Sequence, residues 1–358
     1  MVVAPKPVGK SSASTLVSAV PTEIQIHSTR LFPKGCGADA YRIAGIAARC
    51  DWVVLSDEQS PQTVLVEQRQ GPSPQHIFLS LRQPFAALEF FHSQVLPRVE
   101  GRFRLISGSE DITVPTQLDQ RWRAFHASEQ KIIEQILDDS RLMSWAAENL
   151  STHSDRRWMP LPLGLTFPEG GSADPLRVPS CQPQSSRPLR VLCAHRIREG
   201  EQWNLRRQIT KLCQDELPAW SSVYEEDVSA SMFEHLLGMH AFVICGAGGG
   251  LDPSPKAWLA LLHGAIPILR SSGLDGAYRQ LPVVIVSDWN SEELSLERLR
   301  SWQATLAPWF DEPQRRAEVL HRLSIDYWWQ MINSHDPNQA DSQSQLTQAQ
   351  PTGDYRHQ

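Results

Sequence analysis

The stretch that decides the fold is residues 241–269, AFVICGAGGGLDPSPKAWLALLHGAIPIL. Its first five residues are apolar and mostly bulky, which is typical of a strand buried on both faces. Ser254 and Pro255 have the form of a helix cap followed by a proline in the first turn, and apolar residues then continue to Leu262. Gly264 marks the end of the helix, and residues 266–269 resume as a strand. The stretch therefore predicts a parallel strand, helix and strand unit.

The glycines between the strand and the helix predict an anion site. Gly248, Gly249 and Gly250 allow the backbone to come close to a ligand without a Cβ in the way. The helix start presents free N–H groups and the positive end of the helix dipole, and Lys256 lies in the same turn. This favours a phosphate or diphosphate, although glycine-rich loops without a ligand are also common. The spacing is neither GxGxxG nor GxxxxGK[ST], which argues against nicotinamide dehydrogenases and P-loop NTPases.

The composition limits the class of protein. A length of 358 residues suggests two domains, and the net charge of −6 gives no global attraction to nucleic acid. We therefore expect no nucleic-acid partner. No run of about 20 apolar residues exists, so we expect no integral membrane segment, and the first twenty residues lack the apolar core of a signal peptide. The six cysteines have no zinc-ligand spacing. These features predict a cytoplasmic protein without a bound metal.

Strands alternate with helices along most of the chain, which predicts an α/β fold with mostly parallel sheets. Within it we expect two helices at residues 120–137 and 141–150. Composition divides the chain into five segments. They are a disordered leader (1–22), an N-terminal Rossmann-like domain (23–167), a linker rich in Pro, Ser, Gly and Gln (168–188), a C-terminal Rossmann-like domain (189–332) and a disordered tail (333–358).

Two motifs in the C-terminal half resemble a known family. Residues 256–268, KAWLALLHGAIPI, are similar to the pattern R/K-x-W-E-A-L-x-x-G-x-I-P-[IV], and residues 280–289, QLPVVIVSDW, are similar to D-L-P-[VI]-[VI]-[VI]-x-D-W. Both patterns occur in exostosin-like inverting glycosyltransferases of the GT-B type, which have two Rossmann-like domains facing each other across a cleft. The resemblance covers roughly residues 100 to 330 and is strong only from about 240 to 290.

The resemblance implies a glycosyltransferase. The C-terminal domain would bind a nucleotide-sugar donor, the N-terminal domain a glycan or other small-molecule acceptor, and inverting transfer would occur between them without metal or cofactor. Leu259 stands where the family has an acid that meets the donor ribose, and His263 or Asp252 is a candidate replacement. The alternative is a non-catalytic descendant that binds a sugar nucleotide or glycan, or serves as a partner subunit.

Candidate site residues follow from their places after strands. Asp111 is the candidate catalytic base, since an inverting transfer needs a group to take the acceptor proton; its alternative role is as an ordinary turn residue before Pro115. Arginines near the first strands of the C-terminal domain can bind a diphosphate or remain solvated surface charges. The candidate donor-binding residues are Arg196, Arg206, Arg207, Gly248, Gly249, Gly250, Asp252, Ser254 and Lys256. The candidate cleft-lining residues are Ser109, Glu110, Asn149, Gly164 and His195.

Overall fold

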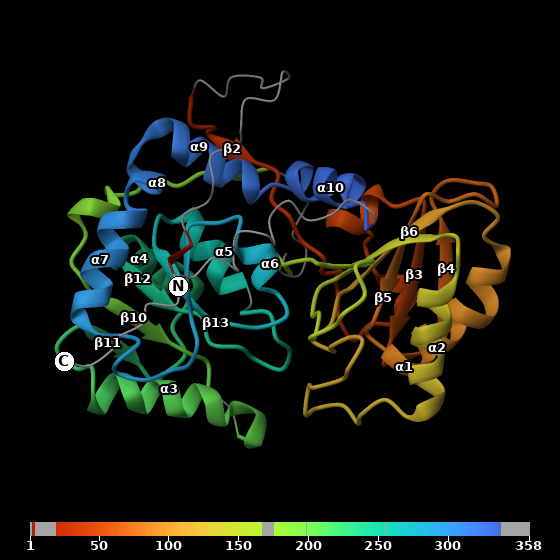
Figure 1. Ribbon diagram of the computed structural model, residues 1–358, viewed down its shortest axis with the longest axis horizontal. Coiled ribbons are helices and arrows are strands. Elements are labelled where there is room, and N and C mark those ends of the chain that lie inside the picture. The colour runs from red at the N-terminus through yellow and green to blue at the C-terminus, as the bar shows by residue number, and fades with distance from the viewer. Residues whose placement is uncertain (1, 4–18, 167–174, 198, 254, 338–358) are drawn as a thin grey trace, which may run out of the picture.

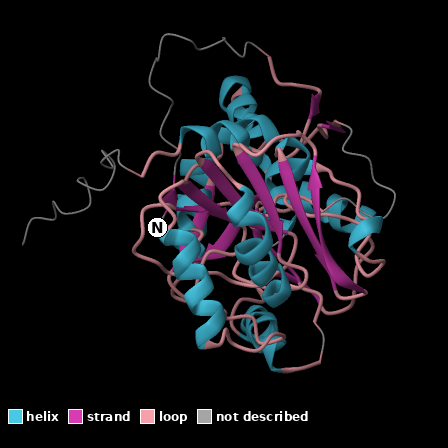
Figure 2. Ribbon diagram, turned by 90° about the vertical axis from the view of Figure 1, so that its right-hand side faces the viewer, coloured by secondary structure: helices cyan, strands magenta, loops and turns pink. Residues whose placement is uncertain are grey.

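The computed structural model describes residues 2–3, 19–166, 175–197, 199–253 and 255–337. Two six-stranded sheets, both mostly parallel, make up its centre, so the expected α/β class is confirmed. The sheets lie side by side in Figure 1, and Figure 2 shows the strands with helices packed around them. Among the described residues, no helix combines the length and the apolar character needed to cross a membrane.

The first sheet has the order β4-β3-β5-β6-β7-β8. All of its strands are parallel except β4, which returns from β3 as an antiparallel hairpin at the edge. Helix α1 packs against β3 and β5, and helix α2 packs against β7. The bounds are β3 (Trp52–Asp57), β4 (Ser60–Glu67), β5 (His76–Ser80), α1 (Pro84–Phe90), β6 (Phe103–Gly108), α2 (Ala127–Asp138), β7 (Leu142–Ala147) and β8 (Trp158–Pro160).

The second sheet has the order β1-β14-β13-β12-β10-β11. From β10 the chain adds β11 on one side, then crosses over to add β12, β13 and β14 on the other, so the direction of winding reverses between β10 and β12. The bounds are β1 (Val2–Val3), β10 (Val191–Ala194), α3 (Asn204–Asp215), β11 (Ser221–Tyr224), α4 (Ala230–Met239), β12 (Phe242–Ile244), α5 (Pro255–Leu262), β13 (Ile266–Arg270), α6 (Asp275–Tyr278), β14 (Val283–Val286), α7 (Leu296–Leu306), α8 (Pro308–Asp311), α9 (Pro313–Arg322) and α10 (Ile325–Ser334).

The unit predicted at residues 241–269 is confirmed as β12, α5 and β13, with the two strands parallel. The second helix expected in the N-terminal half, at residues 141–150, is wrong. Most of that segment is β7, which lies between β6 and β8 with nearly every side chain buried. Its Leu, Met and Ala residues have good helix propensity, but the pairing with both neighbouring strands decides the structure.

Helix α10 joins the two sheets. Helix α10 follows the helices of the second sheet yet reaches the first, where Asn333 bonds His76 and Arg104. Strands β2 (Glu23–Ile24) and β9 (Leu176–Arg177) form a small antiparallel pair, so the described part of the expected linker is structured. Val2 and Val3 of the expected leader form β1 by adding to the edge of β14. Two consecutive β-branched residues suit such an edge.

Candidate functional site

A pocket of about 400 Å³ opens at the point where the winding of the second sheet reverses. Its walls come from the loop after β10, from the segment that leads into α4, and from α5. In open parallel sheets, ligands bind in the crevice beyond the carboxyl ends of the strands at such a reversal. The predicted residues that line it are His195, Arg196, Arg206 and Lys256.

Lys256 and His195 form the centre of this pocket. Lys256 Nζ donates to the carbonyl of Ala194 at 2.7 Å and lies 3.1 Å from His195 Nδ1. A charged ammonium has only donors, so Nδ1 accepts and the ring proton is on Nε2. His195 is 2% exposed, and its Nε2 has no hydrogen-bond partner among the described residues. The ring therefore holds an unused N–H donor beside Gly246 in the glycine loop.

Burial sets the charge states of this pair. Burial lowers the pKa of Lys256 to about 8, so most of the ammonium is charged at neutral pH. Burial, together with the charges of Lys256 and Arg206, lowers the pKa of His195 well below its usual value. The pair is thus a charged ammonium next to a neutral imidazole. This arrangement offers donors to an anion without a second buried charge.

The three predicted arginines take different positions. Arg206 donates to the carbonyls of Ala247 and Arg196, both at 3.1 Å, so it ties the glycine loop to the loop after β10. Arg196 is exposed and pairs with Asp227 at 2.8 Å at the rim of the pocket. Arg207 does not line the pocket and donates to Gly200 and Asn204. Adjacent helical residues point about 100° apart, so α3 cannot direct both Arg206 and Arg207 into one site.

The predicted glycines Gly248, Gly249 and Gly250 do not line this pocket; their loop is a contact between the two sheets. A Cβ on Gly248 would meet the end of Arg206, and one on Gly249 would overlap the guanidinium of Arg121. A Cβ on Gly250 would meet Asn149 Oδ1 at 2.5 Å and the carbonyl of Asp111. Close backbone approach to the other half of the molecule therefore requires at least Gly250.

Asn149, Asp252 and Gly164 connect the elements around the site. Asn149 Oδ1 accepts the N–H groups of Leu251 and Asp252, both at 2.9 Å, which places Asn149 at the seam between the sheets. Asp252 is buried and accepts from Leu163 N–H at 3.0 Å and from Tyr278 at 3.1 Å. Gly164 has φ +78° and packs against the backbone of His27, where a Cβ would not fit. Ser254 lies outside the described residues.

A cluster of charges follows β6 and β7. Burial raises the pKa of Asp111, but the charges of Arg30 and Arg121 outweigh burial and lower it to about 2. Both arginines pair with the carboxylate of Asp111, Arg121 at 2.7 Å. A carboxylate held this way is a weak base, and its surroundings do not support the predicted role of Asp111 as the proton acceptor.

The neighbours of Asp111 have structural bonds. Glu110 is buried and pairs with Lys34 at 2.7 Å and with Arg82 at 3.4 Å. The Ser109 hydroxyl accepts from Leu31 N–H at 3.1 Å, and the backbone N–H of Ser109 donates to the Glu148 carboxylate at 2.8 Å. These contacts hold the loop after β6 in place, and neither side chain lines the pocket beside Lys256.

Several pocket residues were missed from the sequence. Leu259 does lie in the pocket wall, and the acids of the pocket come from other elements, namely Glu226, Asp227 and Glu234. Glu226 and Asp227 follow the carboxyl end of β11, and this position is the signal that could have identified them. Arg121, which covers Gly249, lies in an irregular segment before α2 and carries no such signal.

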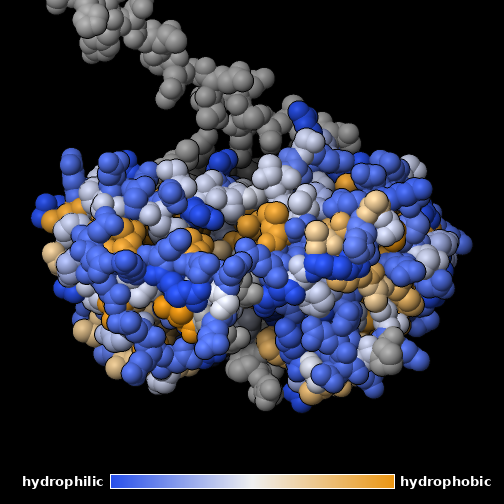
Figure 3. Space-filling model, turned by 90° about the horizontal axis from the view of Figure 1, so that it is seen from below, coloured by the Kyte–Doolittle hydropathy of each residue, from blue (hydrophilic) through white to orange (hydrophobic). Residues whose placement is uncertain are grey.

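The surface seen from below is mostly hydrophilic, with hydrophobic residues in scattered groups (Figure 3).

Comparison with known proteins adds little to this description. No protein-family model and no characterised protein sequence matches the chain. Among solved structures, the chain is similar to an alpha-glucosyltransferase in complex with UDP-glucose and DNA containing an abasic site, with 10% sequence identity and a TM-score of 0.36 over 73% of this chain and 81% of the other. A likeness of this size carries no argument about function, and the exostosin-like family stays a prediction.

Proposed function

We propose that this chain is a glycosyltransferase whose nucleotide-sugar donor binds in the pocket between β10 and β12. One observation carries the proposal: the charged Lys256 and the unused N–H of His195 lie together where the winding of a parallel sheet reverses. That position and those donors suit a diphosphate, the part common to most nucleotide-sugar donors.

The chemistry that these residues support is stabilisation of a leaving group. The acceptor oxygen forms its bond to the anomeric carbon as the bond from the sugar to the diphosphate breaks, and the acceptor proton goes to solvent water. The electron pair of the broken bond and the negative charge go to the nucleoside diphosphate. In this proposal Lys256, His195 and the first turn of α5 would supply the donors that stabilise that charge. This supports transfer without a metal or a cofactor, with the nucleotide-sugar as a substrate.

The finer points of the proposal concern the arrangement of the two halves. We propose a GT-B arrangement, with the acceptor near the carboxyl ends of the first sheet and the sugar transferred between the sheets with inversion. The domain ranges 23–167 and 189–332 belong to this proposal. It is supported by the contact of Asn149, which follows β7, with the loop that precedes α5.

A second function is favoured by two observations. Asp111 is neutralised by two arginines, and the wall of the pocket has Leu259 in place of an acid. Both suit a protein that binds a sugar nucleotide without transferring the sugar.

A donor panel tests both functions. Purified protein is mixed with UDP-, GDP- and CMP-sugars, and both thermal stabilisation and release of the free nucleotide are measured. Stabilisation with slow release supports a transferase. Stabilisation without release under any acceptor mixture supports the binding protein, and no stabilisation by any donor contradicts both.

A further inference from the structure

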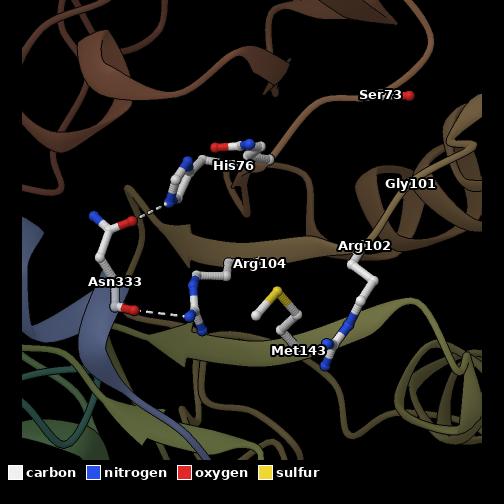
Figure 4. Close-up of a pocket in the computed structure, with 8 residues that line it drawn as sticks. Ser73, His76, Gly101, Arg102, Arg104, Met143 and Asn333 are labelled. Carbon is white, nitrogen blue, oxygen red and sulfur yellow. Dashed lines mark hydrogen bonds between the residues drawn. The ribbon is translucent and has the colours of Figure 1, made fainter.

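A second pocket, of about 490 Å³, lies at the amino ends of β5, β6 and β7. The Asp111 cluster follows the carboxyl end of β6, so this pocket and that cluster lie at opposite ends of the strands of the first sheet. Figure 4 shows that strands of the first sheet and the end of α10 supply its lining. Among the described residues that line this pocket, the charged ones are Arg102 and Arg104.

Arg104 is a buried cation whose hydrogen-bond acceptors are neutral. It donates to the carbonyl of Asn333 at 2.7 Å, to the carbonyl of His335 at 2.9 Å and to the hydroxyl of Ser144 at 3.1 Å. These bonds cap the carboxyl end of α10, whose dipole favours a positive charge. Within the described ranges, no carboxylate lies within ion-pair distance of Arg104.

Arg102 has no comparable structural role. It is two residues before Arg104, so the two side chains leave the same face of the extended chain, and Figure 4 shows Met143 between them. Arg102 is exposed and, in the part of the chain that is described, makes no ion pair. Burial and the charge of Arg102 lower the pKa of Arg104, and the charge of Asp336 partly opposes them. An anion between the two guanidinium groups would relieve this repulsion.

The remaining polar lining is neutral. Gln75 contributes an amide and Ser73 a hydroxyl, whereas the Asn333 amide already bonds His76 at 2.9 Å and the carbonyl of Trp329 at 2.8 Å. Two acids lie near the pocket without lining it. Asp51 accepts the N–H groups of Gln75 and His76 at 2.7 and 3.0 Å and pairs with Arg69 at 3.3 Å, and the charge of Asp336 acts on Arg104. Amides and hydroxyls bind sugar hydroxyls, whereas guanidinium groups bind phosphate.

We propose that this pocket binds a small phosphorylated sugar, with the phosphate on Arg102 and Arg104 and the hydroxyls on the Gln75 amide and the Ser73 hydroxyl. The site is separate from the pocket beside Lys256 and does not depend on the function proposed for that pocket. A bound ligand would fasten the end of α10 to the first sheet.

Isothermal titration of the full chain with glucose 6-phosphate, glucose 1-phosphate, inorganic phosphate and glucose tests this site. We expect saturable binding of at least one sugar phosphate with one site per chain, and at least tenfold weaker binding of inorganic phosphate and of glucose. Equal affinity for inorganic phosphate would overturn the sugar part of the proposal. Binding of neither sugar phosphate would overturn the site itself.

Two matched variants locate the binding. Arg102→Glu reverses the exposed charge without touching the cap of α10, and we expect it to weaken sugar-phosphate binding at least tenfold. Arg300→Glu makes the same change at an exposed position on α7 and should leave the affinity unchanged. If Lys256→Met abolished the binding and Arg102→Glu did not, the ligand would occupy the other pocket and the proposal would be wrong.

Discussion

Lys256 Nζ lies 3.1 Å from His195 Nδ1, so a charged side chain from the helix after β12 fixes the proton of a buried ring that follows β10. The pair spans the reversal of the second sheet. Its consequence is a neutral N–H donor and an ammonium in one pocket, and the donor-binding predictions follow from that pairing.

Lys256 should make the binding of a nucleoside diphosphate depend on pH. Its pKa is lowered to about 8, so the charged form is lost as the pH rises through that value. A bound anion stabilises the charged form and moves the loss to higher pH. We expect the affinity for UDP to fall about tenfold between pH 7 and pH 9, measured by isothermal titration.

The variant Lys256→Arg is the control for this titration. Arginine stays charged over the whole range, so any fall that remains in the variant belongs to the ligand. An identical fall in both proteins would contradict the role of Lys256.

His195→Leu should separate binding from folding. The variant removes the buried Nε2–H, which lacks a partner among the described residues and costs about 1–3 kcal/mol when left unpaired. The variant also removes the Nδ1 acceptor of Lys256, which offsets this gain, so we expect a nearly unchanged melting temperature and an affinity for UDP that is about tenfold lower. Thermal unfolding with and without UDP measures both. A lower melting temperature with unchanged affinity would make His195 a structural residue only.

Two alanine substitutions in the glycine loop should differ sharply. A Cβ on Gly250 would meet Asn149 Oδ1 at 2.5 Å together with the backbone of Asp111, whereas a Cβ on Gly248 would meet the end of the flexible Arg206 at 2.9 Å. We expect Gly250→Ala to lower the free energy of unfolding by about 1–3 kcal/mol and Gly248→Ala to lower it by less than about 1 kcal/mol. Urea unfolding measures both. Equal effects would contradict the close contact at Gly250.

Part of the fold and part of the candidate site could be predicted from the sequence. The strand, glycine loop and helix at residues 241–269 were predictable because apolar runs, a cap and a terminal glycine are local signals. The strand β7 was not, because Leu142–Ala147 has helix-forming residues and its structure depends on β6 and β8. Lys256 was a candidate from its place in the first turn of the predicted helix, and His195 from its place in the loop after a strand. That they touch, and that Arg121 covers Gly249, depends on packing between segments far apart in the chain.

Asp111 should contribute to stability above pH 4. Its pKa is lowered to about 2 in the folded chain, against about 3.9 when unfolded, so its contribution is lost as the pH falls from about 4 towards 2. We expect Asp111→Asn to be less stable than the parent by about 2 kcal/mol at pH 7, with the difference shrinking between pH 4 and pH 3. Urea unfolding across this range measures it. Asp215→Asn, which alters an exposed residue at the end of α3, is the control, and a difference for Asp111→Asn that did not change with pH would contradict the two ion pairs.

The measurement that tests the central claim most directly is a crystal structure of the chain soaked in turn with UDP, GDP and CDP. The proposed function predicts a diphosphate in the pocket beside α5, with oxygens within hydrogen-bond distance of Lys256 Nζ and His195 Nε2. A nucleotide bound only elsewhere, such as beside Arg102 and Arg104, or no bound nucleotide at saturating concentration, would contradict it.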